Sequence, residues 1–161
     1  MGRGTKQRHM DASILQKVAL FEGLTQSQLL RVAAIARPRG HQAGACLFRE
    51  GETGRDMFII LEGKVRISQQ VPGMGEEALA ILEKGQYFGE MSVIEDIPRS
   101  ADAYAHTSCT LWVIEREQLD HLMFTDKDLA YVLLWSFVRT LSVRLRETNA
   151  KMKTFLALSR F

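Results

Sequence analysis

The segment Phe88–Ala101 is the most informative run of the chain and reads FGEMSVIEDIPRSA. It sets a carboxylate, Glu90, and a guanidinium, Arg99, on the two sides of a short segment. Proteins bind anionic phosphate with guanidinium groups, backbone N–H groups and helix N-termini, and a carboxylate accepts a hydrogen bond from a sugar hydroxyl. Gly89 permits close backbone approach, and residues 91–94 suffice for one helical turn whose amides would point at a phosphate. These residue types therefore suit a ligand that is part sugar and part phosphodiester.

Short β-type runs surround this segment from His41 to Ile114. Glycine-bearing turns separate them, and we interpret Gly51 and Gly63 as turn glycines rather than ligand contacts. Many short strands at close spacing are typical of a sandwich or barrel rather than of an alternating β–α–β sheet. The pattern predicts a small jelly-roll-like β-barrel over about residues 41–114. The runs are Cys46–Phe48, Met57–Leu61, Lys64–Ser68, Leu79–Leu82, Ala101–Ala105 and Cys109–Ile114.

Helical signals flank the β region on both sides. On its N-terminal side Thr25 and Gln28 form a capping box, which predicts a short helix over Gln26–Ala36. Residues 1–10 carry no periodicity, and we expect them to form a mobile tail. The predicted fold class is α+β, mainly β: a small jelly-roll-like β-barrel flanked by N-terminal helices and a long C-terminal helix, in one domain of residues 11–161.

The C-terminal helix is predicted over about residues 126–158, with Thr125 as its cap, because no Pro or Gly interrupts this stretch. Its apolar positions recur every 3.5 residues, as in a coiled-coil seam. Two interpretations stay open: the helix packs on its own barrel, or two copies form a parallel homodimer. We assign the first to the earlier part, through Leu133, Trp135 and Phe137, and favour the second for the later part. The seam consists of Leu134, Val138, Leu141, Leu145, Met152 and Phe155.

The composition excludes several classes of protein. With 161 residues, 46% hydrophobic and 25% charged, the chain matches a single globular domain and not a disordered or fibrous protein. A net charge of +2 is too small to imply a polyanionic partner. No apolar run approaches the ~20 residues that span a membrane.

The cysteines and histidines give no sign of a metal site. Cys46 and Cys109 stand alone in the sequence, and Cys109 falls in an apolar run, where a buried thiol is favoured over a disulfide. We therefore expect a reducing, cytoplasmic location. The four histidines are scattered without the pair spacing of metal ligands, and no nucleophile–base pair is evident. Neither a cofactor, nor a metal, nor catalytic residues are expected.

Phe88-Gly89-Glu90 followed by Pro98-Arg99-Ser100-Ala101 resembles the phosphate-binding cassette of cyclic nucleotide-binding domains. Such domains occur in protein kinase A regulatory subunits, nucleotide-gated channels and bacterial catabolite activators. The resemblance implies that Glu90 accepts the ribose 2′-OH and that Arg99 pairs with the cyclic phosphate. The alternative for either residue is a surface salt bridge of little energetic value, but the flanking residues favour the binding site. The resemblance completes the phosphate site with Gly89, Met91, Ser92, Ser100 and Ala101.

The later part of the long helix, Val143–Met152, resembles the dimerisation helix of the catabolite activator family. A Thr-Ser pair contacts the base there, so the resemblance implies a base contact from Thr148 and a cross-subunit contact from Asn149. Asn149 departs from the family's Ser, and Thr148 could instead only fix the register of the seam. Apolar neighbours of the base would be Ile67 and Leu79, which as strand residues could also be plain core.

The function expected from this resemblance is a cyclic-nucleotide-sensing regulatory module, not an enzyme. We expect cyclic AMP first, because Thr148-Asn149 points to adenine, and cyclic GMP second, because Ser100 also permits guanine. Movement of the C-terminal helix would relay binding. The alternative is a ligand-free interaction and dimerisation domain on the same fold. Because no helix-turn-helix residues are identifiable before Phe161, we expect no direct nucleic-acid binding by this sequence. Either its partner is an unidentified output protein, or the sequence is a fragment of a longer regulator.

Overall fold

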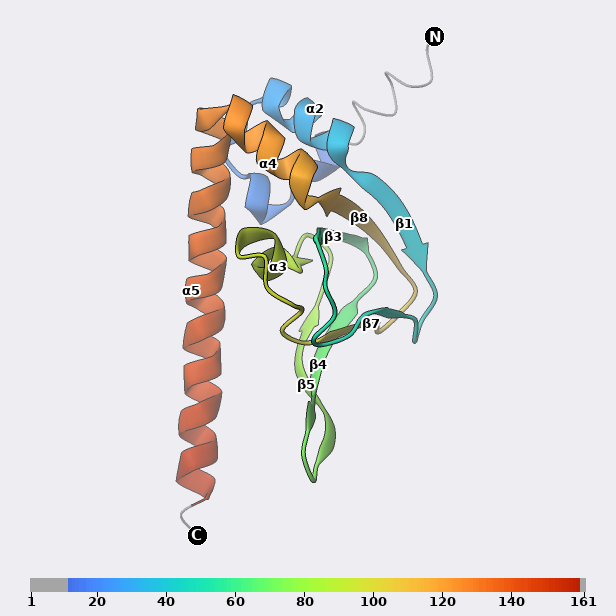
Figure 1. Ribbon diagram of the computed structural model, residues 1–161, viewed down its shortest axis with the longest axis vertical. Coiled ribbons are helices and arrows are strands. Elements are labelled where there is room, and N and C mark those ends of the chain that lie inside the picture. The colour runs from blue at the N-terminus through green and yellow to red at the C-terminus, as the bar shows by residue number, and fades with distance from the viewer. Residues whose placement is uncertain (1–11, 160–161) are drawn as a thin grey trace.

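The computed structural model describes residues 12–159, so the tail predicted at residues 1–10 lies outside the described residues. Figure 1 shows helices α2 and α4 at one end of the strands and helix α5 running along one side of the molecule. No helix within the described residues is both long and apolar enough to cross a membrane. The strands and α5 together enclose the site described below.

Eight strands form two antiparallel sheets of four. The strand order is β1-β8-β3-β6 in one sheet and β2-β7-β4-β5 in the other. Strands that are neighbours in sequence often lie in different sheets, as in jelly-roll folds, so the predicted architecture is confirmed. The strands are β1 (Arg37–His41), β2 (Cys46–Phe48), β3 (Asp56–Glu62), β4 (Val65–Val71), β5 (Gly75–Leu82), β6 (Tyr87–Phe88), β7 (Asp102–Ala105) and β8 (Cys109–Glu115).

The sheet that contains β3 and β8 is covered on both faces. Successive residues of β3 alternate between two cores: Met57 and Ile59 join the core beneath the helices, while Phe58 and Ile60 join the core between the sheets. A strand with two buried faces reads as an unbroken apolar run rather than as an alternating one. This explains the runs MFIIL and LWVI in the sequence.

Helices α2 (Gln26–Ile35) and α4 (Arg116–Thr125) pack together at one end of the sandwich. The capping box predicted for α2 is confirmed. Thr25 Oγ1 accepts from the amide of Gln28 at 3.3 Å, and Gln28 Oε1 accepts from the amide of Thr25 at 2.9 Å. The remaining helical elements are residues 12–15, the 3₁₀ turn η1 (Ala19–Phe21), α3 (Glu90–Ile94) and α5 (Lys127–Leu158).

The N-cap of α5 is Asp126, and the prediction that Thr125 caps this helix is wrong. The Asp126 carboxylate accepts from the amide of Leu129 at 2.9 Å and forms an ion pair with Arg31 of α2. Thr125 is the last residue of α4, and its hydroxyl donates to the carbonyl of His121 at 3.0 Å. Since α4 runs on to Thr125, that hydroxyl serves the end of one helix and is not free to begin the next.

The earlier part of α5 is anchored in the core beneath the helices. Leu129, Leu133 and Phe137 are at most 3% exposed there, which confirms the predicted packing for Leu133 and Phe137. The same prediction for Trp135 is wrong, because its side chain is 47% exposed. Two residues along a helix rotate the side chain by about 200°, so Trp135 cannot share a face with Leu133 or Phe137.

Both cysteines are free, as expected from their sequence context. Cys109 is 5% exposed in the core between the sheets, and burial raises the pKa of its thiol. Cys46 is exposed on β2.

Candidate functional site

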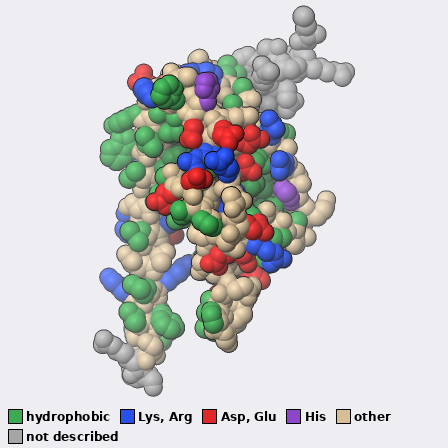
Figure 2. All heavy atoms as spheres, viewed as in Figure 1, with side chains coloured by type: hydrophobic (Ala, Val, Ile, Leu, Met, Phe, Trp, Pro, Cys, Tyr) green, Lys and Arg blue, Asp and Glu red, His purple; other side chains and the backbone are tan. Residues whose placement is uncertain are grey.

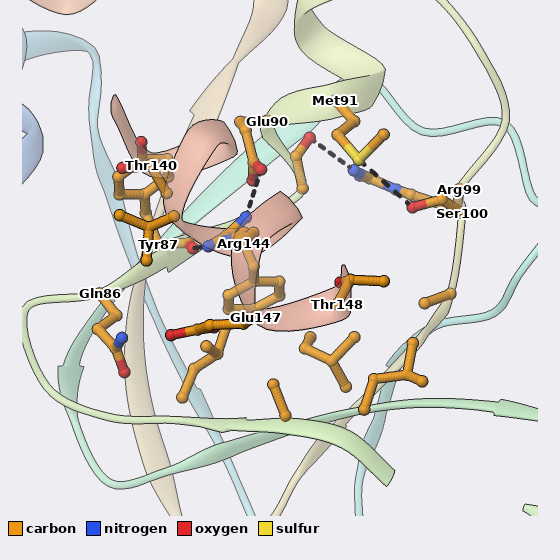
Figure 3. Close-up of a pocket in the computed structure, with 18 of the residues that line it drawn as sticks. Gln86, Tyr87, Glu90, Met91, Arg99, Ser100, Thr140, Arg144, Glu147 and Thr148 are labelled. Atoms are coloured by element: carbon orange, nitrogen blue, oxygen red, sulfur yellow. Dashed lines mark hydrogen bonds and ion pairs between the residues drawn. The ribbon is translucent and has the colours of Figure 1, made fainter. Parts of the chain in front are cut away.

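A cavity of about 600 Å³ lies between strands β4 to β6, helix α3 and helix α5. Pockets of roughly 300–1,000 Å³ are typical for small molecules. All the predicted site residues except Asn149 line it: Ile67, Leu79, Gly89, Glu90, Met91, Ser92, Arg99, Ser100, Ala101 and Thr148. Figure 3 shows Glu90, Arg99 and Thr148 around the same space, on three different segments of the chain.

Gly89 sets the direction of the chain at this site. It is the N-cap of α3 and has a left-handed backbone with φ of 79°. A Cβ at this position would lie 2.8 Å from Arg99 Nη1 and 3.0 Å from the carbonyl oxygen of Asp56. Both the positive φ and the close approach therefore require glycine. The turn that follows buries Glu90 and leaves Met91 39% exposed.

Arg99 is a buried cation, only 5% exposed. Its Nη1 donates to the carbonyl of Gly89 at 3.2 Å, and its guanidinium lies 4.2 Å from the centre of the Phe48 ring. Gly54 packs so closely that a Cβ there would come within 2.1 Å of Arg99 Nε. That Nε is buried and has no hydrogen-bond partner within residues 12–159.

The charge of Arg99 is only partly compensated by its surroundings. Burial lowers the pKa of the guanidinium, and the carboxylates of Asp56 and Glu52 oppose that shift. Neither carboxylate forms an ion pair with Arg99 within 4.0 Å among the described residues. A buried guanidinium with one hydrogen bond and no ion pair fits an anionic ligand, because burying a charge without a partner is costly.

Glu90 is 1% exposed and is already paired in this structure. Its carboxylate forms an ion pair with Arg144 of α5, whose Nη2 also donates to the carbonyl of Tyr87 at 2.6 Å. Burial raises the pKa of Glu90, while the Arg144 charge acts in the opposite direction. The carboxylate that the sequence assigned to a ribose hydroxyl therefore also holds helix α5.

Sequence reasoning missed Arg144. A signal was present, because Arg144 lies four residues before Thr148 and so on the same side of a helix. The same spacing places further α5 residues at the cavity: Arg139, Thr140, Val143, Glu147 and Lys151.

Two more polar contacts hold α5 over the cavity. Lys151 Nζ donates to the carbonyl of Leu79 on β5 at 2.7 Å. Tyr87 donates its hydroxyl to the carbonyl of Ser136 at 3.4 Å, and burial raises the pKa of Tyr87 to about 12. With the Arg144 pair, these contacts connect α5 to β5, β6 and α3.

Ser100 and Thr148 line the cavity from two different segments, the loop before β7 and helix α5 (Figure 3). The carbonyl of Ser100 accepts from Gln69 Nε2 at 2.8 Å, and its hydroxyl donates weakly to Met91 Sδ at 3.7 Å. Asn149 does not line the cavity of this single chain, although the neighbouring Thr148 does. The structure thus brings the cassette residues and Thr148 together but leaves Asn149 outside.

The cavity is lined by groups that can bind a small molecule with both polar and apolar parts. It offers a buried cation, a buried carboxylate and apolar walls from Ile67, Leu79 and Leu82. Within residues 12–159 there is no group of His, Cys, Asp and Glu that could hold a metal ion.

Residues 38–126 match a family model that is described as "Cyclic nucleotide-binding domain". A CRP-like cAMP-activated global transcriptional regulator of Mycobacterium tuberculosis is 30% identical over 84% of this chain and 59% of its own length. The human cGMP-dependent protein kinase 2 is 31% identical over 73% of this chain and 16% of its own. This chain therefore spans less than two thirds of either relative.

Solved structures share the fold. The crystal structure of a cyclic nucleotide-binding domain from Methylobacillus flagellatus has a TM-score of 0.79 and 25% identity. The match covers 94% of this chain and 85% of that one.

Proposed function

The chain belongs to the cyclic nucleotide-binding domain family, and on that basis we propose that it is a regulatory module that binds a cyclic nucleotide in the cavity between β5, α3 and α5. The observation that carries the proposal is Arg99, a buried guanidinium that lines a small-molecule cavity and forms no ion pair within residues 12–159. An anionic cyclic phosphate supplies the negative charge that this guanidinium lacks.

Glu90 accepts the ribose 2′-OH in this proposal, and Arg144 stays near enough to share the carboxylate. An ionised carboxylate has about four acceptor sites, so one ion pair does not exhaust it. The phosphate lies against Arg99, Ser100 and the amides of Met91, Ser92 and Ala101. Thr148, Ile67 and Leu79 then surround the base.

Cyclic AMP is the first ligand and cyclic GMP the second. The Mycobacterium tuberculosis relative is described as cAMP-activated and the human relative as cGMP-dependent, so similarity alone does not choose between them. The choice rests on Thr148-Asn149, which resembles the pair that contacts adenine in the catabolite activator family. Ser100 permits the guanine amino group as the second possibility.

Binding is relayed by α5. The cavity side of this helix carries Arg144, Thr148 and Lys151, each of which a ligand can contact or displace. A ligand shifts the position of the helix only by binding one position more tightly than another. The proposed role is that of a regulator, not of an enzyme.

A parallel homodimer through α5 completes this proposal. Leu134, Val138, Leu145, Met152 and Phe155 of the seam are between 50% and 67% exposed in the single chain, and Leu141 is partly buried. Exposed apolar stripes of this kind are typical of interaction surfaces. Thr148 borders both this seam and the cavity, and Asn149 would reach the partner's site.

Calorimetric titration of cyclic AMP and cyclic GMP into the wild type, Arg99→Leu and Arg39→Leu tests the proposal. We expect saturable binding to the wild type and about a 10-fold or greater loss in Arg99→Leu, since a hydrogen bond to a charged group contributes about 1.5–3 kcal/mol. Arg39 is exposed on β1 and away from the cavity lining, so its variant is the matched control. Full binding by Arg99→Leu would contradict the phosphate assignment. Absence of binding by the wild type would favour the ligand-free interaction domain instead.

The output protein, a cytoplasmic location and the extent of the domain over residues 11–161 remain predictions.

A further inference from the structure

The loop between α3 and Arg99 contains an unusual backbone conformation at Asp96. Within residues 12–159, Asp96 is the one residue other than glycine with a positive φ, at 53°. Asp is among the side chains that tolerate this left-handed region, although it is still less favourable there than a right-handed conformation. A residue in such a conformation persists when its surroundings hold it.

Two arginines hold Asp96. Arg116 Nη1 lies 2.9 Å and Arg55 Nε 3.9 Å from Asp96 Oδ1, and both contacts are ion pairs without hydrogen-bond geometry. Arg55 also pairs with Glu117 at 2.7 Å, and Arg116 with Asp120 at 3.4 Å. Figure 2 shows this cluster as basic side chains flanked by acidic ones, over the region where α3, α4 and β3 meet.

The same segments also hold Arg99. The amide of Arg99 donates to the carbonyl of Glu52 at 2.9 Å, and Gly54 packs against the Arg99 guanidinium. Arg55, the next residue, accepts from the amide of Arg116 at 2.7 Å through its carbonyl. The loop from Asp96 to Arg99 is therefore attached at both ends to one frame, built from residues 52–55 and the start of α4.

We propose that Asp96 is a positioning residue for the nucleotide site: its ion pairs with Arg116 and Arg55 hold the Asp96–Arg99 loop in its binding conformation before the ligand arrives. This inference rests on the proposed function of the cavity. Without the pairs the loop samples other conformations, and the apparent affinity falls in proportion to the binding-competent fraction. The effect is small and salt-dependent, because Asp96 and Arg55 are more than half exposed.

The test compares Asp96→Asn, Arg116→Gln, their double variant and Glu95→Gln. Asn tolerates the same positive φ as Asp, so Asp96→Asn removes the charge and keeps the backbone preference. Glu95 is the neighbouring carboxylate and takes no part in these ion pairs, which makes it the control. We expect Asp96→Asn to weaken cyclic AMP binding by about three- to fivefold, mainly through a slower association rate.

Three further results are expected. The affinity ratio of wild type to Asp96→Asn falls toward one in 1 M KCl, since salt screens the pairs of the wild type. The double variant binds no more weakly than the worse single variant, as for two residues of one interaction. Amide hydrogen exchange of residues 95–99 in the ligand-free protein is faster in Asp96→Asn than in the wild type or Glu95→Gln.

Wild-type affinity in Asp96→Asn at low salt, or equal exchange in all variants, overturns the inference. The exchange measurement needs no ligand. If the wild type binds neither nucleotide, the proposed function fails, and the exchange rates alone decide whether Asp96 orders the loop. Circular dichroism melts of each variant show whether it is folded, and if Arg116→Gln is not, Asp96→Asn alone carries the test.

Discussion

Helix α5 is one unbroken helix, yet its two halves are held in different ways. In the first half Leu129, Leu133 and Phe137 are buried in the core beneath the helices. In the second half the contacts with the rest of the chain are polar: Arg144 pairs with Glu90, and Lys151 donates to the carbonyl of Leu79. The apolar side chains of that half are largely exposed.

The difference distinguishes a first half of the helix that is held by apolar burial from a second half that is held mainly by polar contacts. Apolar burial over three side chains contributes several kcal/mol, and these three residues do not line the cavity. Polar contacts across a cavity are weaker, and a ligand with a phosphate and hydroxyl groups competes for the same partners. The proposed relay therefore assigns the movement to the second half and a fixed position to the first.

The largest expected effect is on the anchor. Leu133→Ala removes a side chain that is fully buried and should lower the free energy of unfolding by about 2–5 kcal/mol. Urea denaturation at constant protein concentration measures it. The matched control is Leu158→Ala, where the side chain is 71% exposed and the loss should stay below about 0.5 kcal/mol. Equal losses at both positions would remove the distinction between the two halves.

The next effect concerns the exposed seam of the second half. Leu145→Glu places a charge in the middle of the proposed dimer contact, and we expect the sedimenting species to fall from two chains to one. Each buried Leu contributes about 1.5–3 kcal/mol, and the contact occurs twice in a symmetric pair. Glu147→Gln, at the cavity side of the same helix, is the control. An unchanged mass in Leu145→Glu would show that the seam is not the interface.

A smaller effect is expected for the polar attachment of the second half. Arg144→Gln leaves the Glu90 carboxylate buried without its cation and should lower the free energy of unfolding at pH 7 by about 1–3 kcal/mol. Amide hydrogen exchange of this variant should become faster in the second half of α5. Faster exchange confined to the first half would contradict the assignment of Arg144 to the attachment of the second half. Arg146→Gln, whose side chain contacts Ser142 instead, is the matched control.

The pH dependence of this variant gives an independent check. Burial already raises the pKa of Glu90 in the folded chain, so the folded state binds this proton more tightly than the unfolded state. The stability that this proton provides is fully present below about pH 4.3, near the ordinary pKa of Glu, and is lost as the pH rises through the folded-state pKa. Without Arg144 that pKa rises further, so Arg144→Gln should lose more stability than the wild type between pH 4 and pH 7.

Most of the cassette was predictable from the sequence, because its residues lie within one short segment. Gly89, Glu90 and Arg99 are separated by at most ten residues, and their neighbours Pro98 and Ser100 are diagnostic in type and order. Six of the eight strands were also predicted, and β3 and β8 most clearly, since their unbroken apolar runs mark two buried faces. The short strands β1 (Arg37–His41) and β6 (Tyr87–Phe88) were missed, because β1 is mostly exposed and contains Pro38 and Gly40, and β6 has only two residues. Residues that are close together in the chain were enough for both of these predictions.

The errors arose where two elements compete for one residue or where rotation about a helix matters. Thr125 is a good capping residue by type, but α4 extends far enough to use it. Trp135 is apolar, but its position on the helix turns it away from the core that holds Leu133.

The sequence by itself therefore determined the family and six of the eight strands, and it named the residues 89–101 that line the cavity, because each depends on residues that are close together in the chain. Only the tertiary structure decided that Glu90 is held by Arg144, 54 residues away, and that Lys151 reaches Leu79, 72 residues away. Contacts over such distances depend on how α5 lies across the sandwich, and that position is set by burial of Leu129, Leu133 and Phe137 rather than by any local pattern around the partners.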